Sequence, residues 1–157
     1  KKLTWANLKA TLKTYFDTLY GGRFTNSAAR AYCTPDQTIP ADVFTKVQLN
    51  NESYDVGGNF DNVTNYRYTV PAGQGGKYLI VGGTGFVGGG PGKWAVCIYI
   101  NNAGGAQSAL TSPGPNAVMN VQDIANLVAG DYIELFVYCD VSDSVSMPNF
   151  LAVHRIS

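Results

Sequence analysis

Most of the sequence consists of short stretches suited to β-strands, each followed by residues that favour turns. About nine such stretches follow one another after residue 30, and this spacing is typical of a β-sandwich or barrel. They are Ala31–Thr34, Asp42–Asn50, Thr64–Val70, Lys77–Val87, Lys93–Ile100, Gln107–Thr111, Ala117–Gln122, Tyr132–Cys139 and Asn149–Ile156. The segment Asp123–Leu127 is expected to form a short turn. We therefore expect a mainly β domain over residues 30–157.

The composition favours one domain that associates with copies of itself. Hydrophobic residues make up 45% of the 157 residues, which is enough for a buried core. Charged residues make up only 14%, and the formal net charge is zero. Such a balance predicts no basic surface for nucleic acid and favours association. No run of about 18 apolar residues is present, so no membrane insertion is expected.

One amphipathic helix is expected before the β domain, over residues 4–20. Thr4 is suited to the N-cap, and Gly21-Gly22 is suited to end the helix. A helix this short is marginally stable alone, so it must associate with other copies or pack on its own domain. Its apolar residues form an a/d seam over two heptads: Trp5, Leu8, Leu12, Tyr15 and Leu19. We expect a stalk or anchor over 1–22, a linker over 23–29 and a head over 30–157.

Cysteines and glycines give no sign of a metal or cofactor site. Cys33, Cys97 and Cys139 lie far apart without a C-x-x-C motif, so they are expected to be free and buried, with one disulfide as the alternative. A G-x-G-x-x-G pattern begins at Gly83, but a strand follows it where a dinucleotide site needs a helix. These glycines instead indicate close backbone approach or a flexible tip.

Catalytic chemistry is poorly represented in the sequence. His154 is the sole histidine and is expected to be an ordinary surface residue, so we predict no catalytic residue and no enzyme activity. A small jelly-roll hydrolase would need His154 beside an acidic residue, and it stays the least favoured alternative. Asp140 and Asp143 are weak candidates for a calcium site, although polar turns explain them more simply.

Five ordered motifs carry a family resemblance. They are Phe44-x5-Asn50, Tyr68-Thr69-Val70-Pro71, Gly76-Lys77-Tyr78, Gly130–Leu135 and Phe150–Val153. This order resembles the C1q/TNF-like domains, although the loop Val56–Asn65 is longer than usual and Gly89–Gly92 is unusually rich in glycine. The resemblance implies a jelly-roll β-sandwich that forms homotrimers, binds a partner and catalyses nothing.

The helix sequence T-W-A-N-L-K-A-T-L-K-T-Y-F-D-T-L-Y adds a second resemblance, to the linker helix of bacteriophage tail fibres. It implies a virion protein, assembled in the bacterial cytoplasm, that serves as a tail fibre, a head fibre or a capsid decoration. Its N-terminal end would bind other virion proteins, and its head would bind a host-surface glycan or protein. The chain starts at Lys1, so we expect it to be a fragment or a processed product.

Three loops are expected to carry receptor binding: Val56–Asn65, Gly88–Lys93 and Thr111–Asn116. Aromatic residues on exposed loops stack against sugars or protein surfaces, and Tyr54 and Phe60 flank the first of these loops. The candidate contact residues in or near them are Tyr54, Asn59, Phe60, Tyr66, Pro91 and Lys93. A secreted C1q-like recognition module remains the alternative; a signal peptide or collagen-like stalk upstream would favour it.

Overall fold

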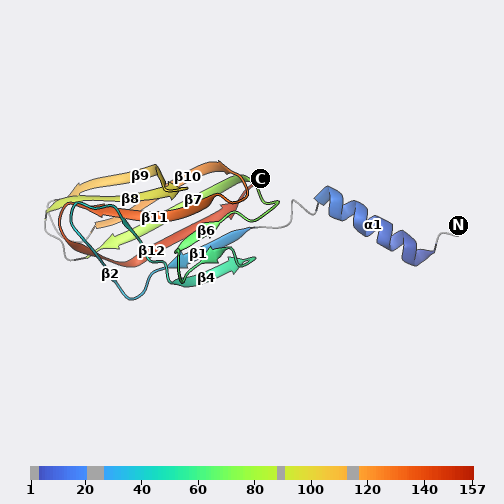
Figure 1. Ribbon diagram of the computed structural model, residues 1–157, viewed down its shortest axis with the longest axis horizontal. Coiled ribbons are helices and arrows are strands. Elements are labelled where there is room, and N and C mark those ends of the chain that lie inside the picture. Colours follow the sequence, from blue (N-terminus) through green and yellow to red (C-terminus); the bar gives the residue numbers. More distant parts are fainter. Residues whose placement is uncertain (1–3, 21–26, 88–90, 113–116) are drawn as a thin grey trace.

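The computed structural model describes residues 4–20, 27–87, 91–112 and 117–157 (Figure 1). These residues contain one helix, α1 (Trp5–Tyr20), followed by twelve strands. The strands are β1 (Ala28–Tyr32), β2 (Gln37–Ile39), β3 (Thr45–Lys46), β4 (Asn51–Val56), β5 (Phe60–Asp61), β6 (Arg67–Thr69), β7 (Gly76–Phe86), β8 (Gly92–Ile100), β9 (Ala103–Ser112), β10 (Ala117–Leu127), β11 (Tyr132–Cys139) and β12 (Asp143–Arg155).

The strands form two antiparallel sheets packed face to face (Figure 1). The first sheet has the order β10-β7-β12-β1-β4, and β2 also pairs with β12. The second sheet has the order β5-β6-β11-β8-β9, and β3 also pairs with β11. Neighbours in each sheet are mostly distant in sequence, as in β1 beside β12, and this is the connectivity of a jelly-roll sandwich.

The core lies between the sheets and follows from the alternation within each strand. In β11, Ile133, Leu135 and Val137 are fully buried between the sheets, because side chains two residues apart share a face. Trp94 of β8 is also buried, and its indole Nε1 donates a hydrogen bond to Asp143 Oδ2 at 2.9 Å. Apolar area removed from water by such residues is the main term that stabilises the sandwich.

Several residues of the resemblance motifs secure turns or fill the core. Asn50 hydrogen-bonds both backbone polar groups of Thr34, which ties the end of the β3–β4 connection to the segment after β1. Tyr68 and Tyr78 are buried with ring centroids 6.1 Å apart. Asp131 accepts hydrogen bonds from the Val128 backbone and from Asn101, and these bonds lower its pKa. These motif residues therefore have structural roles in turns and in the core of the sandwich.

The helix is capped as the sequence predicts and lies apart from the sheets. Thr4 Oγ1 accepts a hydrogen bond from the Asn7 backbone at 3.2 Å, which satisfies one free N–H of the first turn. Apart from half-buried Leu8, the side chains described between residues 4 and 16 are exposed. The described residues show no extensive packing between α1 and any strand.

The boundaries of several elements differ from the sequence prediction. The expected turn over 123–127 is the second half of β10, because exposed and buried or half-buried side chains continue to alternate up to Leu127. The expected strand Asp42–Asn50 pairs only at Thr45–Lys46, since Asp42 has a φ of 60° that interrupts the extended chain. Ala28 and Ala29 lie buried in β1 and thus belong to the head, whereas residues 23–26 of the expected linker lie outside the described residues.

The cysteines and two glycines of β7 lie in closely packed parts of the sandwich. All three cysteines are free and buried, as predicted. Gly82 and Gly83 lie inside β7, where a Cβ would come within 2.5 Å of Leu135 and 2.6 Å of Phe150 respectively, so the close approach is to the chain's own side chains.

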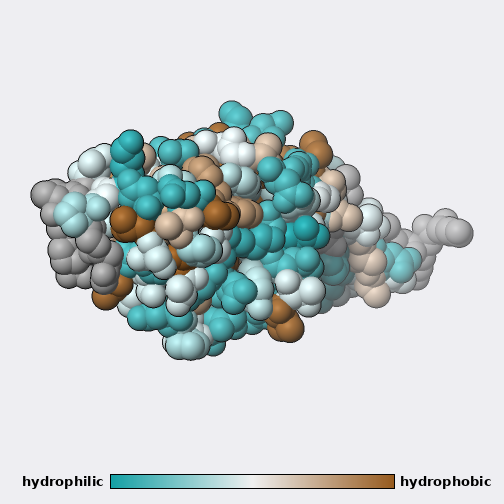
Figure 2. Space-filling model, turned by 60° about the vertical axis from the view of Figure 1, so that its left-hand side comes forward, coloured by the Kyte–Doolittle hydropathy of each residue, from teal (hydrophilic) through white to brown (hydrophobic). Residues whose placement is uncertain are grey.

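On the face seen in Figure 2, hydrophobic residues form small groups separated by polar ones.

Candidate binding surfaces

The outer side of the second sheet carries four aromatic rings that touch one another: Phe44, Tyr99, Phe136 and Tyr138. We call this set the aromatic surface. Tyr99 stacks on Phe136 with ring centroids 4.1 Å apart. Phe44 precedes β3 and lies against both tyrosines, 6.2 Å from Tyr99 and 5.1 Å from Tyr138. Phe44 is 41% exposed, while the other three rings are half-buried, so Phe44 is the outermost ring.

An ion pair lies beside these rings. Lys46 Nζ contacts Glu134 Oε1 at 2.5 Å and lies 5.9 Å from the ring centroid of Phe136. Glu134 is only 1% exposed, whereas Lys46 is 32% exposed, so the lysine side chain links the buried carboxylate to the surface. The second carboxylate oxygen, Glu134 Oε2, is buried without a hydrogen-bond partner. Glu134 lies on the outer side of β11, because it alternates with the core residues Ile133 and Leu135, and it is nevertheless covered there.

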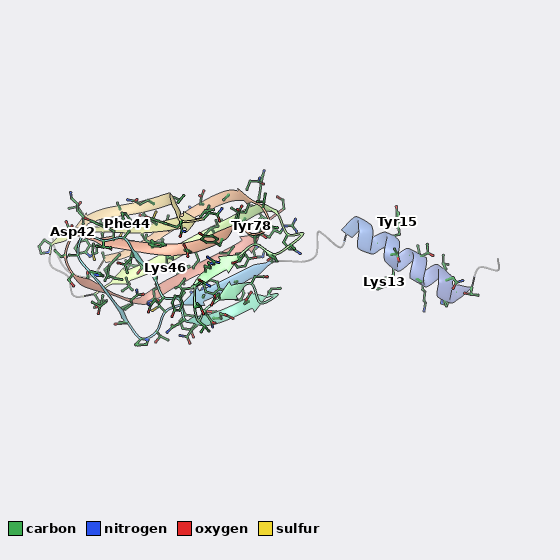
Figure 3. The ribbon with its side chains drawn as sticks, viewed as in Figure 1. Lys13, Tyr15, Asp42, Phe44, Lys46 and Tyr78 are labelled. Carbon is green, nitrogen blue, oxygen red and sulfur yellow. The ribbon has the colours of Figure 1, made fainter. Side chains whose placement is uncertain are left out.

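Asp42 anchors the other edge of the aromatic surface. Its backbone N–H donates to the Cys139 carbonyl at 2.8 Å, and its Oδ1 accepts a hydrogen bond from the Tyr138 hydroxyl at 3.0 Å. This bond and the nearby charge raise the pKa of Tyr138. Figure 3 shows Asp42 and Phe44 towards the end of the sandwich opposite Tyr78.

The outer side of the first sheet carries a second group of exposed apolar side chains: Leu79, Val118 and Ile124. We call this group the apolar face. Leu79 of β7 lies directly opposite Ile124 of β10, and Val118 lies further along the same side of β10. On the neighbouring strands of this side, the Arg30 guanidinium lies over the Phe150 ring at 4.6 Å. Three large apolar side chains thus face water on a sheet whose other side is covered by the core.

The helix seam is exposed where the structure describes it. Trp5, Leu12 and Tyr15 are exposed and Leu8 is half-buried, while the side chain of Leu19 lies outside the described residues. Figure 3 shows Tyr15 and Lys13 on different sides of the helix, as the heptad spacing predicts. A single copy therefore leaves this apolar stripe without cover.

The residues expected to bind a receptor do not form one site. Tyr54 is exposed on β4, Asn59 donates to the Val56 carbonyl, and Tyr66 is half-buried with a φ of 50°. Phe60 was expected on an exposed loop, and this expectation was wrong: the ring is 7% exposed because β5 pairs with β6 and turns it into the core. The loop holding Phe60 lies near the end of the sandwich from which the chain leads to α1 (Figure 1).

Pro91 and Lys93 flank Gly92, the first residue of β8, and β8 begins at the opposite end of the sandwich (Figure 1). Both are exposed, but Lys93 belongs to β8 and its backbone N–H donates to Asp140 Oδ1 at 2.8 Å. Residues 88–90 and 113–116 of the expected loops lie outside the described residues.

The weaker candidates for chemistry have ordinary surroundings in the part of the chain that the structure describes. Asp140 accepts the hydrogen bond from Lys93, and Asp143 accepts those from Trp94 and Ser144. Within the described ranges, no three His, Cys, Asp or Glu side chains gather in a way that could hold a metal ion. His154 is exposed on β12, and no described acidic side chain hydrogen-bonds to it. No helix among the described residues is long and apolar enough to cross a bilayer.

Comparison with solved structures identifies the fold. The chain is similar to Eiger TNF from S. frugiperda at 15% identity, with a TM-score of 0.61 over 85% of this chain and 94% of that one. The chain is also similar to the globular domain of zebrafish complement 1qA at 12% identity, with a TM-score of 0.61 over 83% of this chain and 98% of that one. A third similar structure is murine APRIL at pH 5.0, at 12% identity and with a TM-score of 0.66 over 83% of this chain and 99% of that one.

This chain has the C1q/TNF-like jelly-roll fold. The two six-stranded sheets and the covered core agree with the fold expected from the sequence motifs. No protein-family model matches the sequence, and no curated protein matches it either. The similarity to solved structures therefore supports the fold, and the function has to be argued from the surfaces.

Proposed function

We propose that this protein is a non-enzymatic, homotrimeric component of a bacteriophage particle, a tail fibre, head fibre or capsid decoration whose jelly-roll head binds the host surface. The observation that carries the proposal is the pair of uncovered apolar regions, the helix seam and the apolar face. Exposed apolar area of this kind is typical of surfaces that associate. Zero net charge leaves little repulsion between copies.

Three copies satisfy both regions at once. A heptad seam such as Trp5, Leu8 and Leu12 is buried when parallel helices pack against one another. The apolar face belongs to the outer side of a β-sheet, so copies arranged around the helix axis can bury it against a neighbouring head. The helix would then serve as a stalk or an anchor to other virion proteins, and the outer loops would stay free for a host glycan or protein.

A recognition role agrees better with the described side chains than catalysis does. A hydrolase would need a nucleophile or carboxylate pair within reach of a base, and His154 has no acidic hydrogen-bond partner among the described residues. A secreted C1q-like recognition module shares the fold and the trimer, and it differs only in the setting of the chain. The location of the protein, on phage particles or secreted, distinguishes the two functions.

The experiment combines mass and location. Light scattering of the purified chain should give a mass of about three times 16.8 kDa. An antibody against the head, viewed by electron microscopy, should label phage particles at a fibre tip or on the capsid. A monomer at all concentrations contradicts the trimer, and secretion without any particle labelling favours the recognition module instead.

A further inference from the structure

We propose that the aromatic surface is a saccharide-binding site in which Phe44 is the stacking platform. The inference rests on the proposed function, since it names the class of ligand that the head would bind. It also moves the binding site away from the loops that the sequence suggested. The argument starts from the exposure and rigidity of Phe44.

Phe44 is a fixed ring that stays open to solvent. Its contacts with Tyr99 and Tyr138 hold it from one side, while 41% of the residue remains exposed. Preorganised rings lose little conformational entropy when a ligand binds. The C–H face of a pyranose ring is apolar and its rim is hydroxylated, so it suits an aromatic ring surrounded by polar groups.

The backbone before Phe44 is also held in place. Asp42 has a φ of 60°, which is uncommon outside glycine, and its N–H is bonded to the Cys139 carbonyl. This backbone conformation presents Val43 and Phe44 as an exposed apolar pair, 52% and 41% exposed.

Polar groups suited to sugar hydroxyls flank the rings. Asp42 Oδ1 and the Tyr138 hydroxyl are already bonded to each other, and the exposed carboxylate keeps further acceptor capacity for a ligand hydroxyl. On the other side, the ammonium of Lys46 has a third N–H beyond those that reach Glu134 and Asn65. Because Lys46 and Glu134 neutralise each other, this part of the site favours an uncharged ligand.

Glu134 Oε2 supplies an independent observation. A buried carboxylate oxygen without a partner destabilises the fold and calls for an explanation. A ligand hydroxyl that entered beside Lys46, with the ion pair intact, would provide the missing donor.

Size and position favour a saccharide over a protein. The freely exposed apolar part consists of Val43 and Phe44, which is small beside the roughly 800 Å² per partner of a stable protein interface. The aromatic surface lies on the second sheet, opposite the apolar face of the first, so a trimer built on that face leaves three copies accessible. Weak single-site affinity would then be multiplied by avidity, by about 10² or more.

The test is a binding measurement on the full chain and matched variants. The probes are mono- and disaccharides of glucose, galactose and N-acetylglucosamine in an NMR titration, together with an array of bacterial surface polysaccharides. We expect chemical-shift changes centred on residues 42–46 and 136–138. Phe44→Ala should weaken binding about tenfold or more, whereas Phe44→Tyr should retain it.

Two further variants keep the result decisive. Tyr54→Ala removes an aromatic ring of similar exposure, 45%, from the other sheet, and it should leave saccharide binding unchanged. Phe44→Leu keeps an apolar side chain without a ring, so it should lose a sugar but retain most of a protein contact. Binding that survives Phe44→Ala, or that is lost in Tyr54→Ala alone, overturns the inference.

The remaining outcomes separate this inference from the proposed function. If no saccharide binds while the chain forms trimers and adheres to host cells through a protease-sensitive receptor, the site is wrong and the function stands. If the chain binds saccharide through Phe44 but remains monomeric and absent from phage particles, the site is right and the function is wrong.

Discussion

At the scale of single residues, polar groups on the second sheet are held in place by neighbours that are distant in sequence. Glu134 and Lys46 are far apart along the chain and meet because β3 pairs with β11. The Glu134 carboxylate is almost fully buried. Among the described residues, Lys46 is the only group that compensates its negative charge or hydrogen-bonds to its side chain. Breaking such a pair leaves an uncompensated buried charge, whereas replacing both partners need not.

We therefore expect Lys46→Met to lower the free energy of unfolding by about 2–3 kcal/mol. The double variant Lys46→Met with Glu134→Leu should recover most of that loss, because no charge is left buried. Urea denaturation followed by circular dichroism measures both changes. Equal destabilisation by the single and double variants would show that the lysine contributes through packing and not through charge.

Asp61 gives a stability term that depends on pH. Its carboxylate accepts hydrogen bonds from the Thr64 and Val63 backbone and from Asn65, and these bonds lower its pKa from 3.8 to about 2. The unfolded chain thus binds the proton first as the pH falls. The stabilising contribution is complete above pH 4 and is lost as the pH approaches 2.

Asp61→Asn should lower stability at pH 7 by roughly 1 kcal/mol, because a neutral amide accepts these hydrogen bonds less strongly and the group lies near solvent. Between pH 4 and 2 the difference from the parent protein should shrink. Thermal unfolding at several pH values checks this trend. A difference that stays constant down to pH 2 would show that the charge of Asp61 contributes nothing.

At the scale of elements, α1 and the strands rely on different sources of stability. The strands share one core, but the helix is capped by Thr4 and otherwise exposes its seam to water. An isolated helix of 16 residues is near the lower limit of stability in water. We therefore expect the helix to be stabilised by other copies of itself or by another protein.

Replacing Leu8 and Leu12 with Asp should abolish self-association of the helix while the β signal of the head stays unchanged. The reason is that a charge at a seam position must be desolvated when helices pack. Lys9 and Lys13 lie off the seam, so replacing both with Glu is the matched control. Size-exclusion chromatography with light scattering reports assembly, and an unaltered trimer in the Asp variant would assign the contact to the heads alone.

At the scale of the whole molecule, the sandwich has two different outer sides. The first sheet exposes the apolar face, and the second sheet exposes the aromatic surface with its charged neighbours. One side suits contact between copies and the other suits a small amphipathic ligand. In the proposed trimer, the apolar face would be buried while the aromatic surface would stay accessible.

Leu79→Asp combined with Ile124→Asp should weaken the association of heads and lower the stability of the trimer. Both side chains face outwards, so the isolated domain should remain folded. Val63→Asp is the control, because this residue is highly exposed in the turn between β5 and β6. The mass as a function of concentration measures the effect. If both variants dissociate alike, the apolar face has no special role.

Much of the fold could be predicted because the strands show the alternating or continuous apolar patterns that are typical of β-sheets. Alternation in Tyr132–Cys139 and the apolar runs of β7 and β8 marked strands that the structure contains. The turn predicted at 123–127 was wrong because polar residues such as Asp123 and Asn126 also occur along a half-exposed strand. The burial of Phe60 was missed because a two-residue strand leaves no periodic signal.

The sequence alone determined the class of fold and the helix with its seam, and it favoured free, buried cysteines, because periodicity, capping and composition act over a few residues. Only the tertiary structure decided that Asp42, Phe44, Tyr99 and Tyr138 lie together and that Glu134 is buried beside Lys46. The physical reason is strand register. It joins residues that are tens of positions apart through backbone hydrogen bonds, and no local pattern specifies which strands will pair.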